Sequence, residues 1–162
     1  MRAERTEYAI PGWGVGTLWT DGDGLVLEHE LAFTNGAQPR AGACAGVDRA
    51  AEIVARVQAF LAGREDTLAD VPIDLGWCTP FQHAVTAALR AVPRGEVVSY
   101  GELAALAGYP GAQRAVGTYC ALNRFALLVP CHRVVAAGGI GGYGAAGVAV
   151  KRRLLALEGV RL

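Results

Sequence analysis

Strand-like and helix-like segments occupy different parts of this chain of 162 residues. Residues 16–20 and 25–33 are short β-type runs on either side of Asp21-Gly22-Asp23-Gly24, and Asp-Gly pairs are typical of hairpin turns because glycine accepts a positive φ. A further short strand is predicted at residues 71–75, and helical patterns dominate the rest. We predict an α+β fold: a small N-terminal α/β domain with an antiparallel sheet, residues 1–75, and a mostly helical C-terminal domain, residues 76–162.

Start and stop residues mark the first helices. After Asp48, apolar residues recur at helical spacing until Gly63 ends the pattern. A second helix is predicted at residues 81–91, because Thr79 can cap it and Pro80 suits the first helical position, where a missing N–H costs nothing. Residues 35–46 are rich in Gly and Ala without a period, which predicts a loop.

A pair of short helices follows. Ser99-Tyr100-Gly101-Glu102 is a capping box that opens a helix closed by Gly108, and a second helix covers residues 113–121. Two helices joined by a tight turn form a helix-turn-helix pattern, here predicted to be winged-helix-like, which presents its second helix to DNA. Beyond it we predict an extended run at residues 125–129, a Gly-rich loop at residues 138–147 and a final helix at residues 148–158.

The composition indicates a folded protein without a membrane anchor. Hydrophobic residues make up 52% of the chain, and no apolar stretch reaches the roughly 18 residues that a membrane span needs. The net charge is zero, but residues 1–95 carry eight Arg against twelve acidic residues (−4), whereas residues 96–162 carry six Arg and one Lys against three Glu (+4). This asymmetry is compatible with a C-terminal domain that faces a polyanion.

The N-terminus is charged and no secretory signal follows it, which predicts a cytoplasmic protein. The four cysteines, Cys44, Cys78, Cys120 and Cys131, are scattered without the density of a disulfide framework, so at least one thiol is a candidate for chemistry. The side chains that could bind zinc in or near the N-terminal domain lack the spacing of a zinc site, and we predict no metal; they are His29, Cys44, Cys78 and His83.

Cys131 is the strongest candidate for a nucleophile. It follows Pro130 and precedes His132 and Arg133, and a nearby base or cation makes a thiol more nucleophilic by lowering its pKa. An arbitrary cysteine is more often a buried apolar residue, but this context favours chemistry. Because neighbours on a strand point to opposite faces, His132 can accept a proton from Cys131 only if the backbone bends or a water bridges the two side chains. Glu158 is either a solvated carboxylate at a helix end or the acid that orients His132.

Several runs along the C-terminal half carry a family resemblance. They are Thr79-Pro80-Phe81-Gln82, Gly95-Glu96-Val97-Val98-Ser99-Tyr100, Ala112-Gln113-Arg114-Ala115-Val116-Gly117, Asn123, Val129-Pro130-Cys131-His132-Arg133-Val134-Val135, Lys151 and Leu154-Leu155-Ala156-Leu157-Glu158-Gly159. Together they resemble the O6-alkylguanine-DNA alkyltransferases, suicidal methylated-DNA–protein-cysteine methyltransferases. The resemblance is strong over residues 77–159, and the first 75 residues match only in layout.

The resemblance implies an activity and a partner. The chain would transfer an alkyl group irreversibly from O6 of guanine, or O4 of thymine, to its own Cys131, with one turnover per molecule and no cofactor. His132 would act through a water as the base, Glu158 would polarise His132, and Tyr100 would donate a hydrogen bond to the leaving guanine. The partner would be double-stranded DNA, bound through its minor groove by a monomer with the damaged base flipped out.

The remaining site residues are carried over from the same resemblance. Arg114 would be the finger inserted into the duplex; Ala115, Gly117 and Thr118 would lie against the minor groove, and Arg124, where many relatives have proline, would contact a phosphate. Asn123 would tie the recognition helix to the active-site segment, and the pocket would be formed by Val134, Tyr143, Gly144 and Ala145.

Two other functions compete with this hypothesis. A non-catalytic base-flipping sensor of alkylated DNA would share the fold, but such relatives lack the reactive cysteine. A Cys-His hydrolase would need a directly paired histidine and an oxyanion hole, and it would leave the helix of Arg114 without a role.

Overall fold

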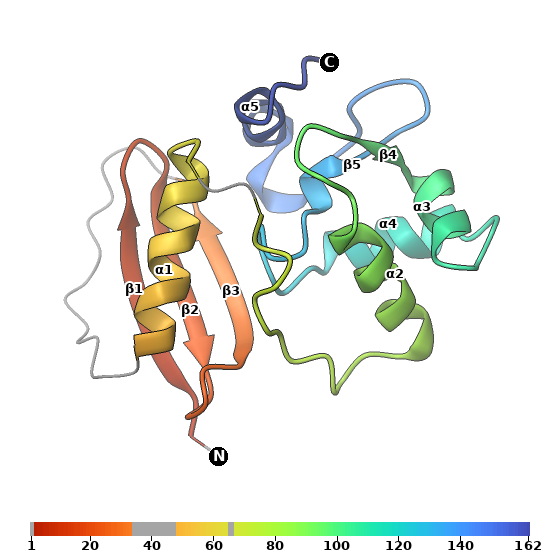
Figure 1. Ribbon diagram of the computed structural model, residues 1–162. Coiled ribbons are helices and arrows are strands. Elements are labelled where there is room, and N and C mark those ends of the chain that lie inside the picture. Colours follow the sequence, from red (N-terminus) through yellow and green to blue (C-terminus); the bar gives the residue numbers. More distant parts are fainter. Residues whose placement is uncertain (1, 34–47, 65–66) are drawn as a thin grey trace. The chain divides into compact units, whose positions relative to one another are not determined.

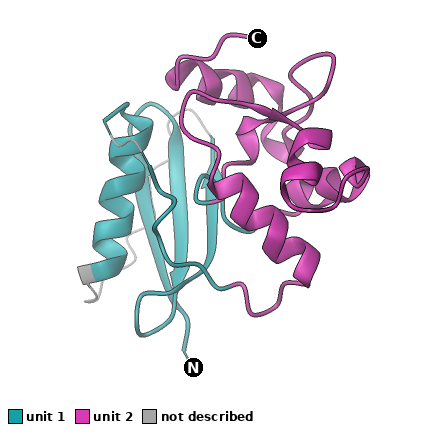
Figure 2. Ribbon diagram, turned by 45° about the vertical axis from the view of Figure 1, so that its right-hand side comes forward, with its two compact units in different colours: residues 1–74, 124–128 teal, residues 75–123, 129–162 magenta. Residues whose placement is uncertain are grey.

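The structure, a computed structural model, describes residues 2–33, 48–64 and 67–162. The chain forms two compact units (Figure 2): the first comprises residues 1–74 and 124–128, and the second comprises residues 75–123 and 129–162. The division therefore falls beside the boundary expected near Gly76, but a short segment from the second half of the chain belongs to the first unit. The architecture is the predicted α+β fold.

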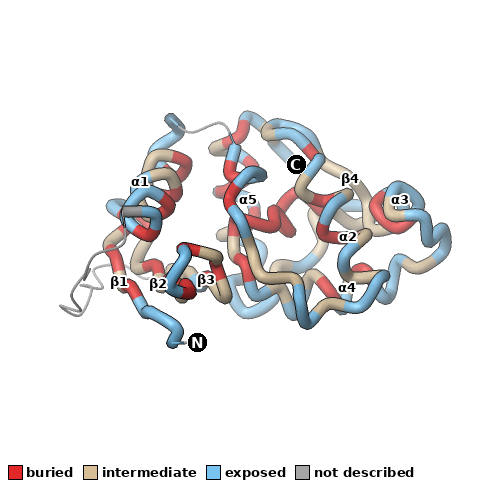
Figure 3. The backbone as a smooth tube through the Cα atoms, turned by 60° about the horizontal axis from the view of Figure 1, so that its bottom comes forward, coloured by how far each residue is buried: buried red, intermediate tan, exposed pale blue. Residues whose placement is uncertain are grey.

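The first unit is a three-stranded antiparallel sheet with one helix (Figure 1). Strands β1 (Glu4–Ile10), β2 (Gly14–Thr20) and β3 (Val26–Ala32) pair in chain order, and burial alternates along β2 as expected for a sheet with one covered face (Figure 3). Helix α1 (Asp48–Leu61) lies across the sheet, where the Gln58 side-chain amide donates to the carbonyl of Ala9 at 2.8 Å. The predicted hairpin and the predicted helix are confirmed, whereas β1 was not predicted.

A glycine in β2 makes room for a buried aromatic pair. A Cβ on Gly16 would lie 2.3 Å from the ring of Tyr8, its cross-strand partner, so only glycine fits there. The Tyr8 hydroxyl donates to Nε2 of His29 at 2.5 Å, and Nδ1 of His29 donates to the carbonyl of Ala126 at 2.6 Å. Burial lowers the pKa of His29 to about 4, which keeps the ring neutral and able to accept from Tyr8.

Two predicted extended segments are not strands. Residues 71–75 make one isolated bridge, between Ile73 and Val26, because Pro72 has no N–H with which to continue a ladder. Residues 125–129 also fail to form a strand: Phe125 bridges His29, and Leu127 then adopts a φ of 64°, a left-handed conformation that turns the chain. The predicted loop at residues 35–46 lies outside the described residues.

The second unit contains the expected helices. Helix α2 (Pro80–Arg90) begins with a capping box between Thr79 and Gln82, and α3 (Tyr100–Leu106) begins with one between Ser99 and Glu102. Helix α4 (Gln113–Ala121) packs against α3. The last helix of the unit, α5 (Val148–Leu157), ends one residue before its predicted end. Strands β4 (Val98–Ser99) and β5 (Val134–Val135) pair in parallel, and two short 3-10 helices, η1 (Cys131–Arg133) and η2 (Gly144–Ala146), complete the unit.

The core of this unit is apolar and closely packed. Its fully buried side chains come from four helices and include Val85, Leu89, Leu103, Val116 and Leu154. In the described part of the chain, no helix is both long enough and apolar enough to cross a membrane.

Candidate active site

Cys131 opens a 3-10 helix and does not continue the extended run that the sequence predicts at residues 125–129. The left-handed turn at Leu127 ends the extended backbone before the cysteine is reached, so Cys131 and His132 do not alternate across a sheet. Cys131 is buried, with 7% of its surface exposed. The side chain of Asn123, which follows α4, hydrogen-bonds to Cys131 and donates to the carbonyl of Val129 at 2.9 Å. One amide thus joins the end of α4 to the segment that carries the thiol.

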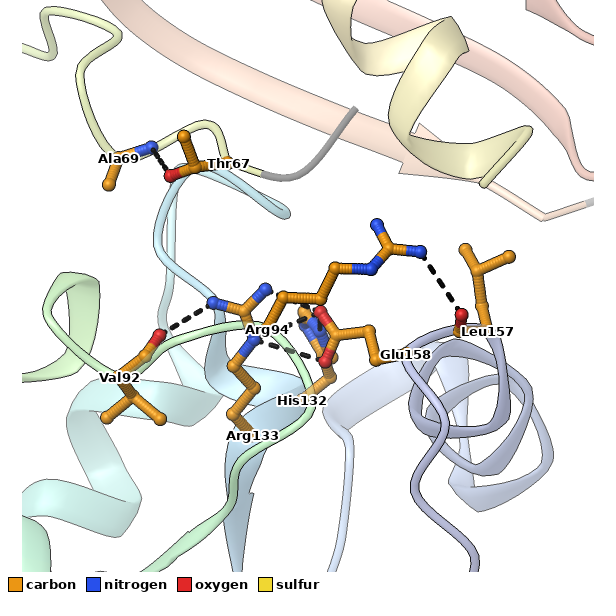
Figure 4. A network of polar contacts seen from close by, with 8 residues as sticks. All are labelled: Thr67, Ala69, Val92, Arg94, His132, Arg133, Leu157 and Glu158. Carbon is orange, nitrogen blue, oxygen red and sulfur yellow. Dashed lines mark hydrogen bonds and ion pairs between the residues drawn. The ribbon is translucent and has the colours of Figure 1, made fainter. Parts of the chain in front are cut away.

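His132 and Glu158 form a buried pair, as the acid-histidine hypothesis requires (Figure 4). Nε2 of His132 lies 3.0 Å from Oε1 of Glu158, and neither side chain is exposed. Burial raises the pKa of Glu158, but hydrogen bonds from His132 and Arg133 outweigh it and hold the pKa at about 2. The carboxylate therefore accepts the Nε2 proton, which leaves Nδ1 as the unprotonated nitrogen. Nδ1 is buried and makes no hydrogen bond within the described part of the chain.

Arg133 holds the carboxylate in place. Its Nε lies 3.0 and 3.1 Å from the two oxygens of Glu158, its Nη2 lies 2.5 Å from Oε1, and its Nη1 donates to the carbonyl of Val92 at 2.8 Å (Figure 4). This two-pronged pairing restricts the carboxylate in both position and orientation. Arg133 was expected as a cation near the thiol, whereas its guanidinium pairs with Glu158.

The electrostatics of the site favour a neutral histidine beside a protonated thiol. Burial lowers the pKa of His132, although Glu158 opposes that shift, so the imidazole is neutral near pH 7 and can accept a proton. A hydrogen bond to Cys120, together with burial, raises the pKa of Cys131. The resting thiol is thus protonated, and its ionisation requires a proton acceptor such as Nδ1 of His132.

A buried lysine holds the Gly-rich loop through hydrogen bonds to backbone carbonyls. Lys151 of α5 is fully buried, and its Nζ donates to the carbonyl of Val134 at 2.6 Å and to that of Gly142 at 2.9 Å. Its charge lowers the pKa of Cys131, against the larger effects that raise it. Lys151 therefore fixes Val134, a predicted pocket residue, and the Gly-rich loop at Gly142, and it supplies a positive charge that favours a thiolate.

Two tyrosines lie near the thiol. A Cβ on Gly141 would lie 3.5 Å from the ring of Tyr100, and one on Gly117 would lie 4.0 Å from it, so Tyr100 occupies the space between α4 and the Gly-rich loop. Burial raises the pKa of Tyr100 and of Tyr143, and the charge of Cys131 adds to both shifts. Both hydroxyls therefore keep their protons and can act as hydrogen-bond donors. Gly144 and Ala145 follow Tyr143 in η2 and are exposed.

Helix α4 presents the predicted DNA-binding residues on one exposed face. Arg114, Ala115 and Thr118 are exposed and Gly117 is half-buried, while Val116 and Tyr119 face the core. Arg114 lies in the first turn, and its backbone carbonyl accepts from the Thr118 hydroxyl at 3.2 Å.

Arg124 is placed differently from the other predicted DNA-binding residues. It is exposed, but its backbone carbonyl accepts from the N–H of His29 at 2.8 Å, and it belongs to the first unit rather than to the helical one.

Within the described ranges, no group of three or more His, Cys, Asp and Glu side chains is arranged to hold a metal ion. His29 is instead engaged with Tyr8 and Ala126, and Cys44 lies outside the described residues.

Comparison with known proteins assigns the family. Residues 80–160 match the family model of the 6-O-methylguanine DNA methyltransferase, DNA binding domain. A methylated-DNA–protein-cysteine methyltransferase of Mycobacterium leprae is 41% identical over 147 residues, which cover 89% of this chain and 87% of the relative. The chain belongs to the methylated-DNA–protein-cysteine methyltransferase family. The methyltransferase of Methanothermobacter thermautotrophicus is 33% identical over 152 residues, covering 91% and 81% of the two chains.

Solved structures of methyltransferases extend the likeness to the first unit. The crystal structure of Mycobacterium tuberculosis OGT in complex with DNA superimposes with a TM-score of 0.74 at 35% identity and covers 98% of this chain and 93% of that one. The O6-methylguanine-DNA methyltransferase of Pyrococcus kodakaraensis superimposes with a TM-score of 0.70 at 27% identity. The first 75 residues, whose sequence matched only in layout, therefore share the fold of these methyltransferases.

Sequence reasoning missed how three residues of this methyltransferase contribute to the site. Arg133 stood in the quoted motif, but its pairing with Glu158 spans 25 positions and left no local signal. Lys151 was quoted without a role, and no local signal marks it as buried, because lysine is usually exposed and two arginines follow it in the same helix. Cys120 was counted among the cysteines without a role, and its effect on the pKa of Cys131 follows only from the fold.

Proposed function

We propose that this chain repairs alkylated DNA directly, by moving an alkyl group from O6 of guanine to the sulfur of Cys131. The observation that carries the proposal is the state of His132: Nε2 is committed to Glu158, and Nδ1 is unprotonated, buried and without a hydrogen-bond partner in the described part of the chain. A base in this state, next in sequence to a protonated thiol, is what thiol activation requires.

The reaction follows from the groups present. A water between the two side chains passes the Cys131 proton to Nδ1 of His132, and Glu158 stabilises the imidazolium that results. The thiolate attacks the alkyl carbon, the carbon–oxygen bond breaks, and the electron pair leaves with the guanine. The Tyr100 hydroxyl, which keeps its proton, donates to the leaving base. The product is a thioether with no hydrolytic exit, so each chain acts once and needs no cofactor.

Duplex DNA is the substrate in this proposal, and a monomer binds it through the minor groove. Arg114, Ala115 and Thr118 lie on the exposed face of α4, and the small residues permit close approach to the groove. Because the target atom lies within stacked bases, the guanine must be extruded, and Arg114 fills the space it leaves. Support comes from the M. tuberculosis relative, whose crystal structure contains DNA. Alkylated O4 of thymine would enter by the same route.

The site also argues against the two competing functions. A sensor has no use for the buried Cys131 and its charged surroundings. A Cys-His hydrolase requires a direct hydrogen bond between thiol and imidazole, whereas Nδ1 of His132 makes none within the described residues.

The test is intact-protein mass spectrometry after incubation with excess duplex containing O6-methylguanine, followed by peptide mapping. We expect one methyl group per chain, on Cys131, and none in Cys131→Ser, which should still bind the duplex. Cys78→Ser, which alters a half-buried thiol of the same unit, is the matched control and should be methylated normally. Methylation at another residue, or transfer by Cys131→Ser, would contradict the proposal.

A further inference from the structure

A strained turn precedes the segment that carries Cys131. The N–H of Leu128 donates to the carbonyl of Ala126 at 2.8 Å across Leu127, whose φ is 64°. A hydrogen bond of this span with a positive φ at its centre is the rare and strained form of the γ-turn. In the described part of the chain, Leu127 is also the only residue other than glycine with a positive φ. Such a conformation persists only where the surrounding contacts hold it.

A second turn follows directly, and a side chain holds its carbonyl. The N–H of Cys131 donates to the carbonyl of Val129 at 2.8 Å across Pro130, whose φ of −82° and ψ of 67° fit the relaxed form of the γ-turn. The Val129 carbonyl accepts a second hydrogen bond, at 2.9 Å, from the side-chain amide of Asn123. The family resemblance gives Asn123 this connecting role, but it assigns no residue to the first turn.

His29 of β3 holds the first turn in the corresponding way. Its Nδ1 donates to the carbonyl of Ala126 at 2.6 Å, so this carbonyl too accepts one hydrogen bond from the turn and one from a side chain. The backbone carbonyl of His29 accepts from the N–H of Ala126 at 3.1 Å, and its N–H donates to the carbonyl of Arg124 at 2.8 Å. One residue of the sheet therefore makes three hydrogen bonds to the residues just before the strained position.

The surroundings of His29 fix which ring nitrogen donates. A carbonyl can only accept, so Nδ1 carries the proton, and Nε2 accepts from the hydroxyl of Tyr8. His29 is 1% exposed and its lowered pKa keeps the ring neutral, so neither water nor protonation disturbs this arrangement near pH 7. Nothing in the alkyl transfer proposed above uses His29 or Tyr8.

We propose that His29 is a positioning residue for the alkyl acceptor. The hydrogen bond from its Nδ1 to the Ala126 carbonyl holds the strained turn at Leu127. Two tight turns lie between that carbonyl and Cys131, so a rotation in the first turn displaces the sulfur. A displacement of about 1 Å at the reacting atoms can slow a reaction about 100-fold. The effect on rate rests on the proposed function, whereas the effect on the turn does not.

Three substitutions separate positioning from stability. His29→Gln places its amide near the position of Nε2, so it keeps a partner for Tyr8 but loses the donor to Ala126. His29→Asn places its amide near the position of Nδ1 and keeps that donor. Tyr8→Phe is the matched control, because it removes the other hydrogen bond of the same ring and leaves the bond to Ala126 in place.

The measurements are the rate constant of methyl transfer at saturating duplex with O6-methylguanine, the dissociation constant of that duplex, and urea unfolding. We expect His29→Gln to lower the rate constant roughly 10- to 100-fold at an unchanged dissociation constant. His29→Asn should restore the rate, and Tyr8→Phe should lose stability but react as fast as the unaltered chain. Equal slowing in Tyr8→Phe and His29→Gln, rates that follow the free energy of unfolding across the variants, or an unchanged rate in His29→Gln would overturn the inference.

Two further measurements do not depend on alkyl transfer. Hydrogen exchange in His29→Gln should be faster at the amides of Leu128 and Cys131 and unchanged within α2, and unchanged exchange at both amides would contradict the inference. In the unaltered chain, nitrogen NMR should show a proton on Nδ1 of His29; a proton on Nε2 instead would overturn the inference even if no variant folds.

The two proposals can fail separately. If exchange at Leu128 and Cys131 rises in His29→Gln but the unaltered chain transfers no alkyl group, the role of His29 in the turn stands and the proposed function fails. If the unaltered chain transfers the alkyl group and His29→Gln does so equally fast, the proposed function stands and the positioning role fails.

Discussion

Replacing Glu158 by glutamine tests the buried network beneath the proposed acceptor. The carboxyl group has a pKa of about 2 in the folded chain against an ordinary value of 4.5. A depressed carboxyl pKa stabilises the folded state above the unfolded value, so its contribution, about 3 kcal/mol, is complete above pH 4.5 and is lost between pH 4.5 and 2. About 2 kcal/mol of it is lost by pH 3.

In Glu158→Gln, the guanidinium of Arg133 stays buried without a negative partner. Removing one partner of a buried ion pair costs about 3–5 kcal/mol, so we expect the variant to be less stable by that amount at pH 7. The difference in unfolding free energy between the variant and the unaltered chain should decrease by about 2 kcal/mol at pH 3. At that pH the unaltered chain has lost most of the stabilisation that the ionised Glu158 provides. Urea unfolding between pH 7 and 3 measures the loss of stability at pH 7 and its decrease at pH 3. The control is Glu96→Gln, which removes an exposed carboxylate of the same unit and should show neither effect.

His132 titrates in the same network, and a second measurement separates the two groups. The carboxyl carbon of Glu158, followed by NMR in the unaltered chain, should show an ionised group down to about pH 3. This readout remains valid if the glutamine variant fails to fold. A carboxyl that titrates near 4.5, or a stability gap that stays constant from pH 7 to 3, would refute the argument.

Three further substitutions test other parts of the molecule. Arg114→Ala should slow alkyl transfer from duplex DNA more than transfer from free O6-alkylguanine, because only the duplex requires extrusion; equal slowing of both reactions would remove its proposed role. Thr79→Ala should lower the free energy of unfolding by about 1 kcal/mol, since it removes the side-chain cap of α2, and urea unfolding checks this. Gly141→Ala should slow transfer from duplex DNA and from free O6-alkylguanine alike. Residue 141 has a φ of +72°, and the new Cβ would lie 3.1 Å from the backbone nitrogen of Ala136 and 3.5 Å from the Tyr100 ring. Unchanged rates would show that the loop adapts to the alanine.

The helices could be predicted because their signals are local. The capping boxes at Thr79 and Ser99 each join residues three positions apart. The residue types at these positions therefore suffice to predict the hydrogen bonds that start each helix. The Asp-Gly turn and the helix after Asp48 are local in the same sense. The strand β1 was missed because its identity depends on pairing with β2 rather than on turn residues of its own.

The sequence by itself determined the fold class, the helix boundaries and, through one specific motif, the residue expected to carry the chemistry. Only the tertiary structure decided which side chains surround that residue and pair with one another beside it. His132 meets Glu158 across 26 positions, Arg133 meets it across 25, and Lys151 reaches the carbonyl of Val134 across 17. The 3-10 turn at Cys131 likewise follows from the left-handed Leu127, in a segment that pairs with His29 nearly 100 positions earlier. Such contacts depend on how separate elements pack, because no periodicity or cap within one element specifies which distant side chain it will meet.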